Sequence, residues 1–133
     1  MPYLKLKLSA AESVETTEKI AVVLTELTAD ILKKKRELTA VEIEFISPQR
    51  WFIGGVSLQE QNATSFYLDI KVTEGTNTKD EKARYVGQVF SSIESIIGPL
   101  ATASYVVIEE VNADAWGYQG QTQEFRYIKG KAL

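Results

Sequence analysis

With 133 residues, 44% of them hydrophobic and 25% charged, the chain has the size and composition of one soluble globular domain. It contains no cysteine and no histidine, which excludes disulfides, thiol catalysis, the commonest metal ligand and the commonest general base. The net charge of −3 and the absence of any basic cluster beyond Lys33–Arg36 argue against nucleic-acid binding, and that short run is expected to finish a helix instead.

The chain opens with alternating residues from Pro2 to Leu8, which predict a strand with Leu4 and Leu6 on its apolar face. Initiator methionine is normally removed before proline, and removal would leave Pro2 with a free secondary amine. Free α-amino groups have a pKa of about 7.7–8.0, so a modest depression makes such an amine a base at neutral pH. If Met1 stays attached, Pro2 is an amide that simply begins a strand, a position that proline tolerates.

Each of two strands is followed by a predicted helix. Apolar residues at helical spacing mark the buried faces, Ile20, Val23, Leu27 and Ile31 in the first half and Val86, Phe90, Ile93 and Ile97 in the second. Capping boxes at Ser9–Glu12 and Thr78–Glu81 are expected to start the helices, and Gly98 with Pro99 to end the second. Further strands are predicted over 40–46 and 105–111, each followed by a turn that contains tryptophan and glycine.

The two halves repeat one pattern. Residues 2–9 align with 66–73 through shared Tyr, Leu and Lys, and residues 41–55 align with 106–120 through shared Val, Ile, Glu, Trp and Gly. Right-handed crossovers make the two strands of each half parallel, and two halves give a four-stranded sheet with both helices on one face. We therefore predict an α+β fold in one domain, residues 1–133, made of repeats of about 1–62 and 63–133. The uncovered sheet face argues for an oligomer.

This ordered set of features resembles the tautomerase superfamily. The family includes 4-oxalocrotonate tautomerase, which is a single-unit chain, and the doubled chains of migration inhibitory factor, malonate semialdehyde decarboxylase and cis-3-chloroacrylate dehalogenase. The resemblance is strongest over residues 2–8, 47–55 and 106–125. It implies a homotrimer with one site per chain at the proline-bearing end, because Phe66 stands at the place of Pro2 in the second half.

The resemblance also implies roles for individual residues. Pro2 is the expected catalytic base or acid, and Trp116, Tyr118 and Phe125 are the expected apolar wall of the substrate pocket. Trp51 occupies the corresponding aromatic place in the first half. The alternative for all four aromatic residues is a structural role in the core or at a subunit interface.

The arginines with which the family holds substrate carboxylates have no counterpart here. Their positions are occupied by Glu12, Ala40, Thr73, Thr76 and Tyr105. Arg50 and Arg126 are the remaining candidates for substrate binding, because a guanidinium binds a carboxylate in a bidentate manner. The alternative for each is a solvated arginine on the surface without a role in binding.

Three further residues stay open as site candidates. Lys34 lies near a lysine used by the migration inhibitory factor branch, although its basic neighbours make that alignment uncertain. Glu109 and Glu110 alternate across the last strand, so one of them is a second acid or base if it points inward and a solvated residue if it does not.

The sequence thus predicts a tautomerase that moves a proton between the keto and enol forms of a small carboxylate-bearing 2-oxo acid, without a metal or cofactor. The alternatives are a non-catalytic trimeric binding or scaffold protein of the same fold, or a decarboxylase- or hydratase-type member of the family. The sequence shows no signal peptide or membrane span, so the cytoplasm is the expected location and no membrane or nucleic-acid partner is expected.

Overall fold

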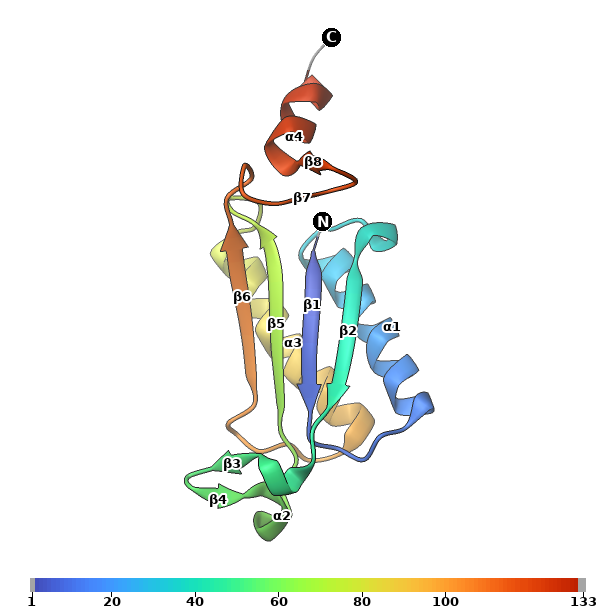
Figure 1. The fold of residues 1–133 in the computed structure, drawn as a ribbon, viewed down its shortest axis with the longest axis vertical. Helices are drawn as coiled ribbons and strands as arrows, with labels where there is room; N and C mark the ends of the chain where they lie inside the picture. Colours follow the sequence, from blue (N-terminus) through green and yellow to red (C-terminus); the bar gives the residue numbers. More distant parts are fainter. Residues whose placement is uncertain (1, 132–133) are drawn as a thin grey trace.

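The computed structural model describes residues 2–131, and its centre is a four-stranded mixed sheet with the strand order β2-β1-β5-β6. These strands are β1 (Tyr3–Leu8), β2 (Ala40–Phe45), β5 (Phe66–Thr73) and β6 (Tyr105–Val111). Helices α1 (Val14–Ile31) and α3 (Lys79–Ile97) lie together on one face of the sheet, as Figure 1 shows. The predicted α+β architecture is confirmed. None of the helices within residues 2–131 is long and apolar enough to cross a membrane.

The strand pairing shows how the two β-α-β units are joined. β1 pairs in parallel with β2, Tyr3 opposite Ala40, and β5 pairs in parallel with β6, Tyr67 opposite Tyr105. Between the units, β1 and β5 are antiparallel neighbours. The heads of β1 and β5 therefore lie at opposite ends of the sheet. The duplicated unit is confirmed, while the division of the chain near residue 62 stays a prediction.

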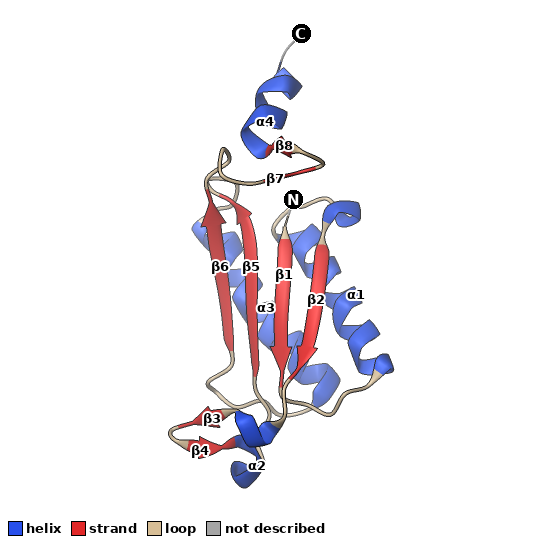
Figure 2. Ribbon diagram, viewed as in Figure 1, coloured by secondary structure: helices blue, strands red, loops and turns tan. Residues whose placement is uncertain are grey.

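Each unit is followed by a small hairpin and a helix. The first set is β3 (Phe52–Ile53), β4 (Val56–Ser57) and α2 (Leu58–Gln61), and the second is β7 (Gly117–Tyr118), β8 (Gln121–Thr122) and α4 (Gln123–Lys131). Two 3₁₀ helices, η1 (Arg36–Leu38) and η2 (Pro48–Arg50), flank β2. Figure 2 shows the two hairpins at opposite ends of the sheet. Both turns have two successive positive φ angles, 64° and 80° at Gly54 and Gly55 and 53° and 76° at Gln119 and Gly120, a geometry that glycine adopts readily.

The core lies between the sheet and the two helices. Leu4, Leu6 and Leu8 alternate with exposed residues along β1 and are buried, as the sequence predicts. Leu68 and Ile70 of β5 continue this apolar layer. Burying one such side chain contributes about 1.5–3 kcal/mol to folding, so the layer fixes which face of the sheet the helices cover.

The two predicted helix starts have different outcomes. Thr78 caps α3 in a complete capping box with Glu81, which confirms the prediction, and α3 ends before Gly98 as expected. The predicted cap at Ser9 is wrong, because α1 begins at Val14 and is capped by Ser13. Ser9 is buried instead: its hydroxyl donates to the Ser65 carbonyl (3.2 Å) and accepts from the Ser65 amide (2.8 Å).

Ile20 and Ile31 of α1 and Ile93 of α3 are buried as predicted, while the other fully buried positions are shifted by one residue from the predicted ones. α1 buries Leu24 and Thr28, and α3 buries Tyr85 and Val89, whereas the predicted core residue Val86 is 39% exposed. Thr and Tyr do not belong to an apolar pattern, but these two satisfy each other through a hydroxyl contact of 2.8 Å. Because Thr28 donates its own hydrogen to the carbonyl of Leu24, Tyr85 is the donor in that contact.

Replacing Tyr85 by Phe tests this buried pair. Burial raises the pKa of Tyr85 to about 12, above its ordinary value of about 10, so its stabilising contribution is present below pH 10 and is lost as the pH rises from about 10 towards 12. We expect Tyr85→Phe to lower the free energy of unfolding by about 1 kcal/mol at pH 7 and to reduce its alkaline loss. Urea unfolding of both proteins at pH 7 and pH 11 checks this, and an equal alkaline loss in both contradicts it.

Candidate functional site

Pro2 lies buried at the head of β1, at the end of the sheet where β5 and β6 finish. The amide of Ala40 donates to its carbonyl (3.3 Å), which ties Pro2 to the head of β2. On the other side, the register that pairs Tyr3 with Lys71 places Pro2 opposite Val72. The position of Pro2 is thus fixed by the strands on both sides.

The second hairpin and α4 lie at this same end of the sheet, as Figure 1 shows. The indole Nε1 of Trp116 donates to Oγ1 of Thr73, the last residue of β5, at 3.1 Å. The amide of Gln123 then donates to the carbonyl of Trp116 (2.9 Å) and fastens α4 to the hairpin. Trp116 therefore sits beside the strand that neighbours Pro2.

Arg126 holds the C-terminal segment together. Its guanidinium lies 3.8 Å from the centre of the Tyr118 ring, and Nη2 donates to the Tyr118 carbonyl (3.1 Å) and to Gln119 Oε1 (3.3 Å). Phe125, its neighbour on α4, is 50% exposed. Trp116, Tyr118, Phe125 and Arg126 thus belong to one segment at the proline-bearing end, but one guanidinium nitrogen of Arg126 is already occupied by the segment itself. Its role in substrate binding stays a prediction.

A half-buried lysine lies at the same end. Lys34 follows the end of α1, and its Nζ donates to Oγ1 of Thr76 (2.8 Å), in the connection that leaves β5. Burial lowers the pKa of Lys34, and the Glu81 carboxylate opposes that shift. Thr76 occupies a position where the resemblance leads us to expect an arginine, so a lysine from the first repeat supplies a cation there. The sequence alone did not single out Lys34, because its neighbours in the run are also basic. Lys33, for example, has a φ of 59° and its Nζ donates a hydrogen bond to the carbonyl of Asp30 instead.

The two glutamates of β6 are not buried acids. Glu109 pairs with Lys71 (2.9 Å) and Glu110 pairs with Lys82 (3.1 Å), and both glutamates are exposed residues. Both glutamates are therefore solvated side chains on the surface of the strand, which is one of the two alternatives that the sequence left open.

Arg50 and Trp51 lie at the other end of the molecule. They follow β2, which runs parallel to β1, so they come next to the end of β1 and not to its head. There they line a hollow of about 450 Å³ together with Lys7 and Tyr67. Within one chain the length of the sheet separates Arg50 from Pro2. The predicted role of Arg50 at the proline site stays a prediction that requires a neighbouring copy.

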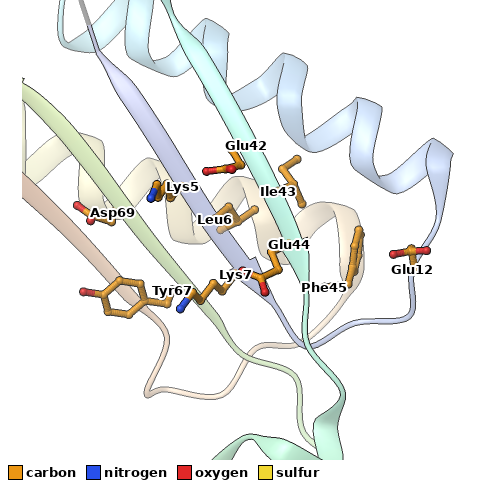
Figure 3. Close-up of a pocket in the computed structure, with 10 residues that line it drawn as sticks. All are labelled: Lys5, Leu6, Lys7, Glu12, Glu42, Ile43, Glu44, Phe45, Tyr67 and Asp69. Atoms are coloured by element: carbon orange, nitrogen blue, oxygen red, sulfur yellow. The ribbon is translucent and has the colours of Figure 1, made fainter.

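A hollow of about 770 Å³ lies on the open face of the sheet and is lined mainly by charged side chains, among them Lys5, Lys7, Glu42, Glu44 and Asp69. Figure 3 shows these side chains rising from β1, β2 and β5 along the middle of the sheet. The pattern reflects the cross-strand pairing, which sets Lys5 beside both Glu42 and Asp69. This hollow does not include Pro2.

A doubled β-α-β sheet with a buried proline at the head of its first strand defines the class of this protein, the tautomerase-like α+β fold. Residues 67–126 match the family described as Tautomerase enzyme. The match begins just after Phe66, the position equivalent to Pro2, so it covers the repeat that lacks the proline. No curated protein sequence matches the chain.

Solved structures extend the similarity to nearly the whole chain. Native fused 4-OT is 19% identical with a TM-score of 0.83, over 92% of this chain and 97% of that one. The F6 fused 4-OT, an asymmetric trimer, is 18% identical with a TM-score of 0.82, over 93% and 98%. A macrophage migration inhibitory factor-like protein from Entamoeba histolytica is 21% identical with a TM-score of 0.75, over 91% and 97%. The resemblance is confirmed in the fold of nearly the whole chain and in the family match of residues 67–126.

Replacing Gly117 by Ala tests whether the second hairpin holds Trp116 in place. A Cβ at this position would overlap the backbone of Gln121, so we expect Gly117→Ala to open the hairpin. Trp116 then moves into solvent and the segment after residue 112 is cleaved faster, without loss of the main sheet. Tryptophan fluorescence, limited proteolysis and circular dichroism measure these effects. Gly87→Ala, where a Cβ meets no atom within 4 Å, is the matched control; equal behaviour of the two variants contradicts the prediction.

Proposed function

We propose that this protein is a tautomerase that uses the amine of Pro2, freed by removal of Met1, for keto–enol proton transfer on a small 2-oxo acid. The observation that carries the proposal is the place of Pro2: a buried proline at the head of β1, fixed by two strands, at the end that also carries Trp116. The tautomerase match of residues 67–126 supports the same class of reaction.

In the proposed reaction the neutral amine of Pro2 takes a proton from the carbon beside the substrate carbonyl. The electron pair of that C–H bond forms the enol double bond, and the resulting ammonium returns the proton to the substrate oxygen or to another carbon. Burial disfavours the charged ammonium form, and so does a cation close to the amine, a role that we propose for Lys34. Both effects keep the amine available as a base near neutral pH.

We propose that Trp116, Tyr118 and Phe125 form the apolar wall for the substrate. Its carboxylate then needs a cation. Lys34 and Arg126 lie at this end of the chain, and Arg50 is available only from a neighbouring copy. Lys34 has a neutral partner, Thr76, and no ion pair within residues 2–131, which favours it as the first of these candidates.

We further propose a homotrimer. Tyr3 and Val107, on the open face of the sheet, are 40% and 38% exposed, and such uncovered apolar side chains are suited to contacts with neighbouring copies. Two fused 4-OT proteins of the same fold form an asymmetric and a symmetric trimer. Light scattering of the protein as it elutes from a size-exclusion column is expected to give a mass three times that of one chain. A measured mass equal to that of one chain overturns the trimer.

The proline chemistry is tested first by intact mass and turnover. We expect the untagged protein to lack Met1 and to convert enol to keto phenylpyruvate. Pro2→Ala keeps a free amine, but this primary amine differs in basicity and placement from the secondary amine of proline. We expect the variant to lose about a hundredfold in kcat. A control with extra residues before Pro2 keeps the ring but turns the amine into an amide, and it should lose turnover while its circular dichroism is unchanged.

A covalent probe tests the amine directly. A protein of the same fold, 10% identical with a TM-score of 0.82, is inactivated by 2-oxo-3-pentynoate. An amine adds to the alkyne carbon conjugated with the ketone, and the proton that it loses ends on the neighbouring carbon, so the protein gains the full mass of the reagent. We expect one adduct per chain on Pro2, located by peptide mapping. Unmodified Pro2 after full trimming contradicts the proposal.

The second candidate is a non-catalytic binding protein of the same fold. It is favoured by the involvement of Arg126 in its own segment and by the uncharged residues Ala40, Thr73 and Tyr105 at arginine positions of the family. If Met1 is retained, or if the trimmed protein shows neither turnover of phenylpyruvate nor an adduct, the binding protein is the correct candidate. If the amine reacts but phenylpyruvate is not turned over, a decarboxylase- or hydratase-type reaction that uses the protonated amine as an acid comes next.

A further inference from the structure

The end of the sheet opposite Pro2 repeats the geometry of the proline end but not its chemistry. Phe66, which takes the place of Pro2, is fully buried, and its ring packs 6.2 Å from that of Phe90 in α3. The first hairpin lies at this end, as the second does at the other. Phe66 lies within the chain and has no free amine, so any function of this end is different from proline chemistry.

Aromatic side chains gather around this end. The hollow of about 450 Å³ has Trp51, Phe52 and Tyr67 in its wall, and a second hollow of about 420 Å³ shares all three and adds Tyr105. Phe52 is 60% exposed and Tyr105 is 58% exposed. Each hollow has a volume in the range of small-ligand sites, and exposed aromatic residues in a group commonly mark a binding surface.

Two cations share the first hollow with these aromatic side chains. Arg50 and Lys7 both line the first hollow, and within residues 2–131 neither forms an ion pair or a side-chain hydrogen bond. Glu44, the cross-strand neighbour of Lys7, lies on its other side from Tyr67 in Figure 3. By contrast, Lys71, the equivalent of Lys7 in the second repeat, is held by Glu109 at 2.9 Å.

We propose that this hollow is a second binding site, which takes a planar aromatic monocarboxylate. The carboxylate lies against the guanidinium of Arg50 and the ammonium of Lys7, and the ring lies against Trp51, Phe52 and Tyr67. The planar fork of Arg50 suits a carboxylate, and the aromatic side chains provide the stacking surface for a flat ring. The assignment goes beyond the proposed proline chemistry and does not depend on it.

The chain contains two tryptophans, Trp51 at this end and Trp116 at the other, so each end has its own reporter. Titration with 2-naphthoate, followed by the two indole N–H signals in ¹⁵N NMR spectra, is expected to move the Trp51 signal in a saturable way. Trp51→Phe and Trp116→Phe assign the signals. Naphthalene-2-carboxamide, the neutral analogue, is expected to bind at least about tenfold more weakly, because a hydrogen bond to a charged group is lost.

The variants Arg50→Gln and Lys7→Gln are each expected to weaken 2-naphthoate about tenfold, and Arg84→Gln, at an exposed arginine of α3, serves as the control for loss of one charge. Circular dichroism checks that each variant is folded. Equal affinity of Arg50→Gln and Arg84→Gln, equal affinity for the neutral amide, a shift of Trp116 alone, or no binding overturns the proposal.

One more measurement separates this site from the proline site. Protein whose Pro2 has been blocked, by 2-oxo-3-pentynoate or by an N-terminal extension, is expected to bind 2-naphthoate with unchanged affinity. If blocking Pro2 abolishes binding, Arg50 belongs to the proline site of a neighbouring copy, and the second site is overturned while the proposed function stands.

Discussion

The antiparallel pairing of β1 with β5 is the constraint on which the whole molecule depends, because it alone joins the two repeats within the sheet. Lys5 and Asp69 occupy equivalent positions in the two repeats and face each other across this pairing. Identical repeats would place the same residue on both sides, and two like charges directly opposite each other destabilise a sheet. The divergence of one repeat to aspartate removes that conflict, and Asp69 also lies 3.6 Å from Nζ of Lys71 on its own strand.

Buried polar groups complete the connection between the repeats. Thr28 of α1 meets Tyr85 of α3, and Ser9, just after β1, meets Ser65, just before β5. Both pairs cross from one repeat to the other inside the protein, where an unpaired hydroxyl is costly. Any other alignment of the repeats leaves these groups unsatisfied, so the apolar layer supplies cohesion and the polar pairs supply specificity.

The sequence predicted the sheet well because alternation and duplication are local and repeated signals. Prediction of the helix faces was less accurate, since Thr28 and Tyr85 are buried through a contact between distant segments that an apolar pattern does not contain. Helix α4 and the two-residue strands were missed for a similar reason, because they are held by contacts that no local pattern contains, such as those of Trp116 with Thr73 and of Arg126 with Tyr118.

The candidate site was only partly predictable. The aromatic residues of the C-terminal segment were placed at the end that carries Pro2 because the resemblance to the tautomerase superfamily implied it. Arg50 lies at the opposite end, which follows from strand direction: the residue after a parallel strand is at the end where its partner finishes. Lys34 was left open because four basic residues in a row look alike, and only the turn at Lys33 decides which of them faces Thr76.

The burial of Phe66 has a consequence for how the two repeats divide their tasks. Under the proposed function the head of β1 must keep an amine accessible, and a large side chain packed in the core cannot do that. The second repeat is free of that demand, and its strand begins with an aromatic ring packed against α3. Under the proposed function the two repeats divide the tasks: the first supplies the amine at the head of its strand, and the second supplies a packed strand start together with the aromatic wall.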